Sequence, residues 1–163
     1  MSKASDHLPV YGPGPIYVGV IVALTVAGIA LSALGVVPMA QPGVAGVPLK
    51  AIGLALVAGG VALWWTANFK AHIDDGIVGN RLVTTGVYAV VRNPIYSAFA
   101  LACSGVILIY GNLWLLVLPP VFWAFLTVLM RATEERWLLD LYGEEYADYC
   151  RKVNRCIPWF PRR

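Results

Sequence analysis

The stretch NPIYSAFALACSGVILIYGNLWLLVLPPVFWAFLTVLM, residues 93–130, consists of 38 consecutive residues without a charged side chain. A membrane-spanning helix needs about 20 apolar residues, because it rises about 1.5 Å per residue through a hydrocarbon core of about 30 Å. The stretch is therefore too long for one crossing, and Gly111-Asn112 near its middle is a typical turn signal. These features predict a hairpin of two transmembrane helices, at residues 95–110 and 113–130.

The second arm of this hairpin carries two consecutive prolines, Pro119 and Pro120. Proline has no backbone N–H, and inside a helix its ring clashes with the preceding turn. We therefore expect a kink in the second arm at this pair.

Two further apolar runs precede the hairpin, at residues 16–37 and 49–69, and Lys50 is the only charged residue within them. The whole chain is 59% hydrophobic and 13% charged, with a mean hydropathy of +0.70, which excludes an ordinary water-soluble domain. The sequence predicts an all-α, polytopic membrane protein in which one domain, residues 1–163, contains four transmembrane helices. Small residues four apart, Gly28 with Ser32 and Ala55 with Gly59, predict where these helices touch.

The remaining charged residues gather in three segments, residues 1–15, 70–92 and 131–163. Four spans place all three segments on the same side of the membrane. They carry 11 of the 12 Lys and Arg residues, and Lys50 is the twelfth. The positive-inside rule therefore predicts a multi-pass integral membrane protein with both termini in the cytoplasm.

Several function classes lack their sequence signals. The chain has no P-loop, no GxGxxG motif and no long basic tract, so nucleic acid is not an expected partner. His7 and His72 have no cysteine or second histidine at ligand spacing, so no metal site is expected. The expected partners are membrane lipids and a lipophilic ligand, and the oligomeric state stays open.

The first polar cluster, residues 80–96, leads into the third span. Proline suits the first position of a helix, so Pro94 places Arg92 and Asn93 at a helix N-terminus. Free backbone N–H groups at such an end favour an anionic group. We therefore expect Arg92 to bind a carboxylate of a ligand.

The second polar cluster, residues 131–161, follows the fourth span. Apolar and aromatic residues recur there at helical spacing, which predicts one cytosolic amphipathic helix. That spacing places Glu134 on the inward stripe and Glu135 beside it. Because the hairpin returns the chain to its starting face, we expect both acids to face Arg92 across a pocket and to bind a ribose diol or balance a cation.

Two interpretations of these acids stay open at this point. In the simpler one, Glu134 and Glu135 only solvate a helix end and pair with Arg131 and Arg136, which contributes about 0.3–0.5 kcal/mol per pair. In the other, they belong to a ligand pocket with aromatic walls that suit a sulfonium ion. The aromatic residues expected near it are Tyr88, Tyr96, Trp137, Tyr142 and Tyr146.

Two motifs at a fixed separation suggest a family. GVYAVVRNPIY, residues 86–96, is followed about forty residues later by EERWLLDLYGEEYADYCRKVNRCIP, residues 134–158. Together they resemble the C-terminal half of the intramembrane methyltransferases, which include isoprenylcysteine carboxyl methyltransferases and phospholipid N-methyltransferases. The resemblance covers residues 80–161. It implies S-adenosyl-L-methionine as methyl donor and S-adenosyl-L-homocysteine as product.

Carried over residue by residue, the resemblance implies catalytic roles for Arg92, Glu134 and Glu135. The residues expected to bind the cofactor are Gly86, Tyr88, Arg92, Asn93, Pro94, Tyr96, Glu134, Glu135 and, among the pocket aromatics, Tyr146. Asn93 stands where many family members have histidine, and an amide does not titrate near neutral pH. The only candidate base is therefore Glu134 or Glu135.

The expected reaction is direct in-line methyl transfer to a lipophilic or small acceptor. The acceptor stays open among an isoprenylcysteine carboxylate, a phospholipid amine and a thiol. Two other functions are compatible with the sequence: a non-enzymatic four-helix membrane scaffold whose tail docks a partner, and an NADPH-dependent membrane reductase.

Overall fold

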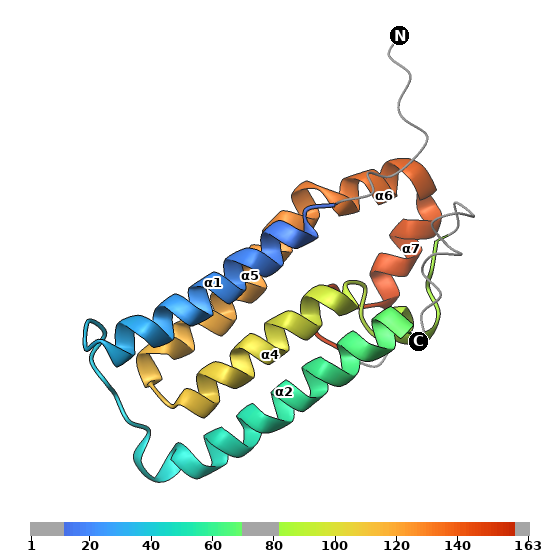
Figure 1. Ribbon diagram of the computed structural model, residues 1–163. Coiled ribbons are helices and arrows are strands. Elements are labelled where there is room, and N and C mark those ends of the chain that lie inside the picture. The colour runs from blue at the N-terminus through green and yellow to red at the C-terminus, as the bar shows by residue number, and fades with distance from the viewer. Residues whose placement is uncertain (1–11, 70–81, 159–163) are drawn as a thin grey trace.

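The computed structural model describes residues 12–69 and 82–158, and in these ranges the regular structure is helical (Figure 1). Most of segment 1–15, residues 70–81 of segment 70–92, both histidines and residues 159–163 lie outside the described residues. Three helical segments are long and apolar enough to cross a membrane, namely Gly14–Ala33, Gly43–Phe69 and Leu113–Tyr142. The fold class of an all-helical membrane protein is therefore confirmed.

The predicted spans correspond to four main helices. These are α1 (Gly14–Ala33), α2 (Gly46–Phe69), α4 (Pro94–Tyr110) and α5 (Leu118–Ala132). Short 3₁₀ helices precede α2, α4 and α5: η1 (Gly43–Ala45), η2 (Gly86–Ala89) and η3 (Leu113–Val117). With 17 residues, α4 is apolar but shorter than the three long segments, and it extends roughly 25 Å at about 1.5 Å per residue.

Helices α1 and α5 lie side by side, and α2 packs along α4 (Figure 1). A methyl group added to Gly53 of α2 would lie 2.7 Å from the carbonyl oxygen of Gly105 in α4, so the two backbones touch. By contrast, a methyl group added to Gly59 would meet nothing within 4 Å, so the predicted helix contact at Gly59 is wrong. Between α1, α4 and α5 lies an apolar core that includes Tyr17, Ile107 and Phe122.

The turn of the hairpin is fixed to the loop between α1 and α2. Asn112 is 1% exposed, and its Nδ2 donates to Ser32 Oγ at 2.7 Å and to the Pro38 carbonyl at 3.1 Å. Its Oδ1 accepts from the backbone N–H groups of Ala40 and Trp114. Every polar atom of this buried amide is therefore satisfied, which fixes one end of the helical bundle.

The expected kink at Pro119-Pro120 is replaced by a helix start. The chain runs from η3 directly into α5, which begins at Leu118 with both prolines in its first turn. Backbone N–H groups in a first turn have no partner within the helix, so proline is tolerated there. The prolines therefore mark where the 3₁₀ segment changes to α-helix.

The predicted single amphipathic helix is also different in the structure. Residues 134–152 form two helices, α6 (Glu134–Tyr142) and α7 (Glu144–Lys152), separated by Gly143. Gly143 has φ +54° and ψ −126°, a conformation that only glycine adopts readily. The bend sends α6 and α7 in different directions at the end of the bundle where α4 begins (Figure 1).

Candidate functional site

The first polar motif is joined to the C-terminal tail by main-chain hydrogen bonds. The N–H of Arg92 donates to the Asn154 carbonyl at 2.8 Å, and Val91 forms a parallel bridge with Asn154. Asn93 donates to the Arg155 carbonyl from its backbone N–H at 3.2 Å and from Nδ2 at 3.0 Å. The backbone of Asn93 is non-helical, with φ −120° and ψ 66°, and α4 then begins at Pro94, as the sequence predicts.

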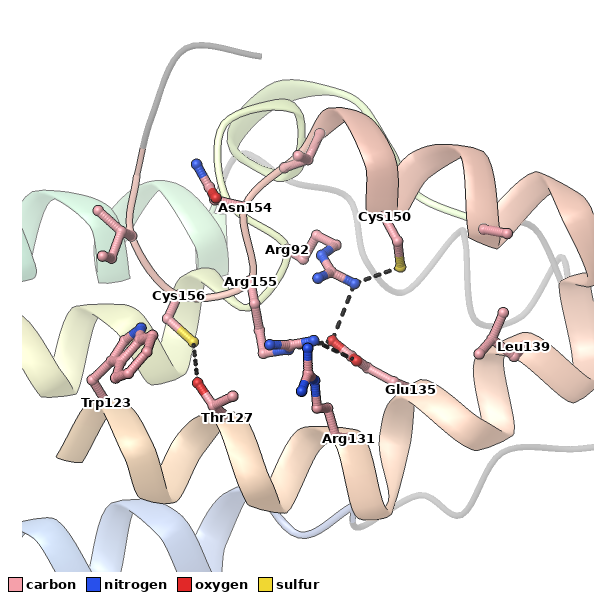
Figure 2. Close-up of a pocket in the computed structure, with 13 residues that line it drawn as sticks. Arg92, Trp123, Thr127, Arg131, Glu135, Leu139, Cys150, Asn154, Arg155 and Cys156 are labelled. Atoms are coloured by element: carbon pink, nitrogen blue, oxygen red, sulfur yellow. Dashed lines mark hydrogen bonds and ion pairs between the residues drawn. The ribbon is translucent and has the colours of Figure 1, made fainter. Parts of the chain in front are cut away.

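A cavity of about 620 Å³ opens beside this junction (Figure 2). Its lining comes from α5, α6, α7, Arg92 and the C-terminal residues 153–157. The lining residues are Arg92, Trp123, Thr127, Arg131, Glu135, Leu139, Ala147, Cys150, Val153, Asn154, Arg155, Cys156 and Ile157. Elements from both polar clusters therefore form one cavity at the end of the bundle.

Glu135 is the carboxylate of this cavity, and two arginines contact it. Arg92 Nη1 lies 3.1 Å from Glu135 Oε1, and the two side chains are 8% and 11% exposed. Arg155 forms a two-pronged contact, with Nε 2.5 Å from Oε1 and Nη2 2.8 Å from Oε2. These hydrogen bonds raise the pKa of the Arg155 guanidinium above its ordinary value. Both oxygens of Glu135 are thus engaged by guanidinium groups.

The charge of the lining is positive. Arg131, from the last turn of α5, points toward the same carboxylate (Figure 2). Three guanidinium groups therefore surround one carboxylate, and an anionic group of a ligand would be attracted.

Arg92 has hydrogen-bonding capacity to spare. Its Nη1 donates to Cys150 Sγ as well as to Glu135, whereas its buried Nε has no partner among the described residues. Buried polar atoms are normally hydrogen-bonded, so an unpartnered donor beside a cavity is unusual. Burial raises the pKa of the Cys150 thiol, so this thiol is neutral near pH 7 and adds no negative charge. The free donor of Arg92 fits a carboxylate acceptor.

Glu134 faces away from this cavity. Tyr96, in the first turn of α4, donates from its hydroxyl to Glu134 Oε1 at 2.9 Å. Glu134 is not part of the cavity lining, although it directly precedes Glu135 in the first turn of α6. The expectation that both acids face Arg92 therefore applies to Glu135 only, because consecutive helical residues point about 100° apart.

The aromatic residues of the second motif form a small core next to the cavity. Tyr146 is 3% and Tyr149 8% exposed, and Tyr149 donates from its hydroxyl to the Tyr88 carbonyl at 2.6 Å. Burial raises the pKa of Tyr88 to about 12 and also raises the pKa of Tyr146 and Tyr149. The hydrogen bond from Tyr149 joins α7 to η2, which begins at Gly86 with φ +61°. Neither Tyr88 nor Tyr146 lines the cavity.

Of the expected site residues, Arg92 and Glu135 line the cavity, and Asn93 and Pro94 shape the backbone beside it. The sequence did not single out Arg155 or Cys150, and it indicated Arg131 only as an ion-pair partner of the two acids, although all three line the cavity. Arg155 lies in the predicted polar segment 131–161, but its role depends on the pairing of the tail with residues 91–93.

Comparisons of the amino-acid sequence with known proteins find methyltransferases. The chain is 37% identical over 81 residues to protein-S-isoprenylcysteine O-methyltransferase of Schizosaccharomyces pombe, covering 49% of the chain and 34% of that protein. It is 30% identical over 107 residues to a probable protein-S-isoprenylcysteine O-methyltransferase of Oryza sativa subsp. indica, covering 65% and 53%. It is 35% identical over 80 residues to methanethiol S-methyltransferase 1 of Bradyrhizobium diazoefficiens, covering 48% and 27%.

These matches span between about a quarter and about half of each relative's length. No solved structure matches the chain significantly. The family model of the phospholipid methyltransferases matches residues 43–145, more than half of the chain, and includes both Arg92 and Glu135. The chain therefore belongs to the phospholipid methyltransferase family.

Proposed function

We propose that the protein is an S-adenosyl-L-methionine-dependent membrane methyltransferase whose cofactor binds in the cavity beside Arg92 and Glu135. The observation that supports this most is the unpartnered Nε of buried Arg92, next to a carboxylate that two guanidinium groups hold in place. Both residues lie in the motifs of the family resemblance.

The residues present fit the chemistry of this cofactor. S-adenosyl-L-methionine supplies a methyl group on a positively charged sulfur and also carries a carboxylate and a ribose diol. Arg92 Nε offers a donor for a carboxylate within a cavity of about 620 Å³, and Glu135 holds the guanidinium groups of Arg92 and Arg155 in place. The chain's own contribution is to orient these groups and to exclude water.

Glu135 suits charge balance rather than proton removal. Both of its oxygens already accept hydrogen bonds from guanidinium groups, so it is a poor general base. Glu134 is engaged by a single neutral hydroxyl and remains the better candidate base of the two. An acceptor that needs no base, such as a carboxylate or thiolate, therefore agrees best with the cavity.

The relatives do not decide the acceptor, because their names give protein-S-isoprenylcysteine in one case and methanethiol in another. We propose a lipophilic or small acceptor reaching the site from the bilayer. We further propose that α4 is a fourth span and that both termini are cytoplasmic. The helix is short enough to require a thinned bilayer or a flanking polar turn at the membrane surface.

The direct test is methyl transfer by the purified protein. S-adenosyl-L-methionine with an isotopically labelled methyl group is incubated with the protein and a lipid extract, and labelled products are identified by mass spectrometry. We expect a labelled lipophilic product that is absent with Arg92→Ala and present with Asp148→Asn, a variant of an exposed residue. Absence of any labelled product, together with thermal stabilisation by NADPH, would instead favour the reductase. Absence of product and of stabilisation by either cofactor would favour the scaffold.

A further inference from the structure

The start of α1 lies directly against the acidic motif. A methyl group added to Gly12 would lie 2.5 Å from Glu134 Oε1. A methyl group added to Gly14, the first residue of α1, would overlap the hydroxyl and ring of Tyr96. At Gly14 a side chain would collide with the Tyr96 ring, whereas at Gly12 it would meet only the flexible end of Glu134.

Tyr96 connects this turn to the first turn of α6. Its ring lies over Gly14 and meets the ring of Tyr17, one turn further along α1, edge-on at a centroid distance of 6.0 Å. Its hydroxyl then donates to Glu134 at 2.9 Å. Because Glu134 directly precedes Glu135, contacts run without interruption from α1 to the carboxylate of the cavity.

We infer that the first turn of α1 positions the acidic pair, with Gly14 and Gly12 as positioning residues for the site. This inference rests on the proposed function. The family model begins at residue 43, so it assigns no role to α1. The described contacts nevertheless show that α1 packs against Tyr96 and limits where its ring can lie. Because the position of the Tyr96 hydroxyl is fixed in this way, its hydrogen bond also fixes the position of Glu134.

The matched pair Gly14→Ala and Gly19→Ala tests this inference. Both glycines lie in α1, but a methyl group at Gly19 meets nothing within 4 Å. We expect Gly14→Ala to weaken binding of S-adenosyl-L-homocysteine about tenfold and to raise KM for the methyl donor more than it lowers kcat, because a hydrogen bond to a charged group is lost. We expect Gly19→Ala to bind like the unaltered protein.

A second background separates positioning from a general structural defect. Tyr96→Phe removes the hydroxyl that donates to Glu134, so it should weaken binding to a similar extent. Gly14→Ala should then cost less than a further twofold in affinity when added to Tyr96→Phe. A methyl group before Pro15 also strains the helical backbone, and that cost would persist in the Tyr96→Phe background.

Two results would overturn the inference. One is an unchanged affinity for S-adenosyl-L-homocysteine in Gly14→Ala. The other is a double variant whose loss of affinity equals the product of the losses in the two single variants. If Gly14→Ala does not fold in detergent, Gly12→Ala replaces it, because it precedes the helix and meets only the flexible end of Glu134. Failure of the unaltered protein to bind S-adenosyl-L-homocysteine would identify the proposed function, rather than the positioning contact, as the source of the failure.

Discussion

Glu135 is the residue on which the charge balance of the cavity depends. Its side chain is 11% exposed and contacts both Arg92, from the first motif, and Arg155, from the second. Removing one partner of a buried ion pair costs about 3–5 kcal/mol, because the remaining charge is left uncompensated. Here the loss of one carboxylate would leave two guanidinium groups close together.

Replacing Glu135 with glutamine tests this balance. We expect Glu135→Gln to destabilise the protein by about 3–5 kcal/mol, seen as a lower unfolding temperature in detergent. The matched control is Glu144→Gln, because Glu144 pairs with Arg151 at 3.0 Å where the two side chains are 81% and 62% exposed. That exposed pair should contribute only about 0–1 kcal/mol. Equal losses in the two variants would contradict a buried ion cluster at Glu135.

The contrast between Arg92 and Arg155 shows what sequence alone can supply at a site. Arg92 is predictable, because Pro94 marks a helix start and the motif places a cation before it. Arg155 is not, because its position depends on hydrogen bonds between residues about sixty positions apart. The different orientations of Glu134 and Glu135 likewise depend on where α6 begins, which Thr133 sets by leaving the helical conformation.

At the scale of elements, the ends of the helices follow local signals and their contacts do not. Residues 95–110 and 113–130 were predictable to within a few residues, because Pro94 and Gly111-Asn112 punctuate a long apolar run. The contact of α2 with α4 at Gly53 and Gly105 depends on how the helices rotate about their axes, which small-residue spacing does not determine.

Gly143 determines the bend between α6 and α7, although the apolar residues continue at helical spacing on both sides of it. Its φ of +54° with ψ −126° is strained for any residue with a side chain, and nothing lies within 4 Å of an added methyl group. We therefore expect Gly143→Ala to destabilise the protein by about 1–3 kcal/mol through backbone strain alone. The measurement is the unfolding temperature in detergent, compared with Gly59→Ala, which also meets nothing but lies within α2. If Gly143→Ala were destabilised no more than Gly59→Ala, the claim that the bend requires glycine at position 143 would be wrong.

At the scale of the whole molecule, the two ends of the bundle differ in chemistry. One end is closed by the satisfied amide of Asn112 and an apolar loop, whereas the other carries the arginine-rich cavity, α6 and α7. Lys and Arg outnumber Asp and Glu by 12 to 9, and 11 of the 12 belong to segments predicted at the cavity end. This asymmetry supports the proposal that the cavity faces the cytoplasm.

Reporter fusions test this orientation. We expect a reporter attached after Arg163 to be active in the cytoplasm, and one inserted between Val37 and Pro38 to be active outside. Both insertion points avoid the helices α1 and α2. The opposite pattern, or the same side for both reporters, would contradict the proposed arrangement of the spans.

Isothermal titration of S-adenosyl-L-homocysteine into the detergent-purified protein and its Arg92→Ala variant measures the proposed role of the cavity most directly. We predict saturable one-site binding to the unaltered protein and an affinity at least about tenfold lower for Arg92→Ala, since the variant loses a charged hydrogen-bond donor. Equal affinity in the two proteins, with both folded, would contradict cofactor binding in this cavity.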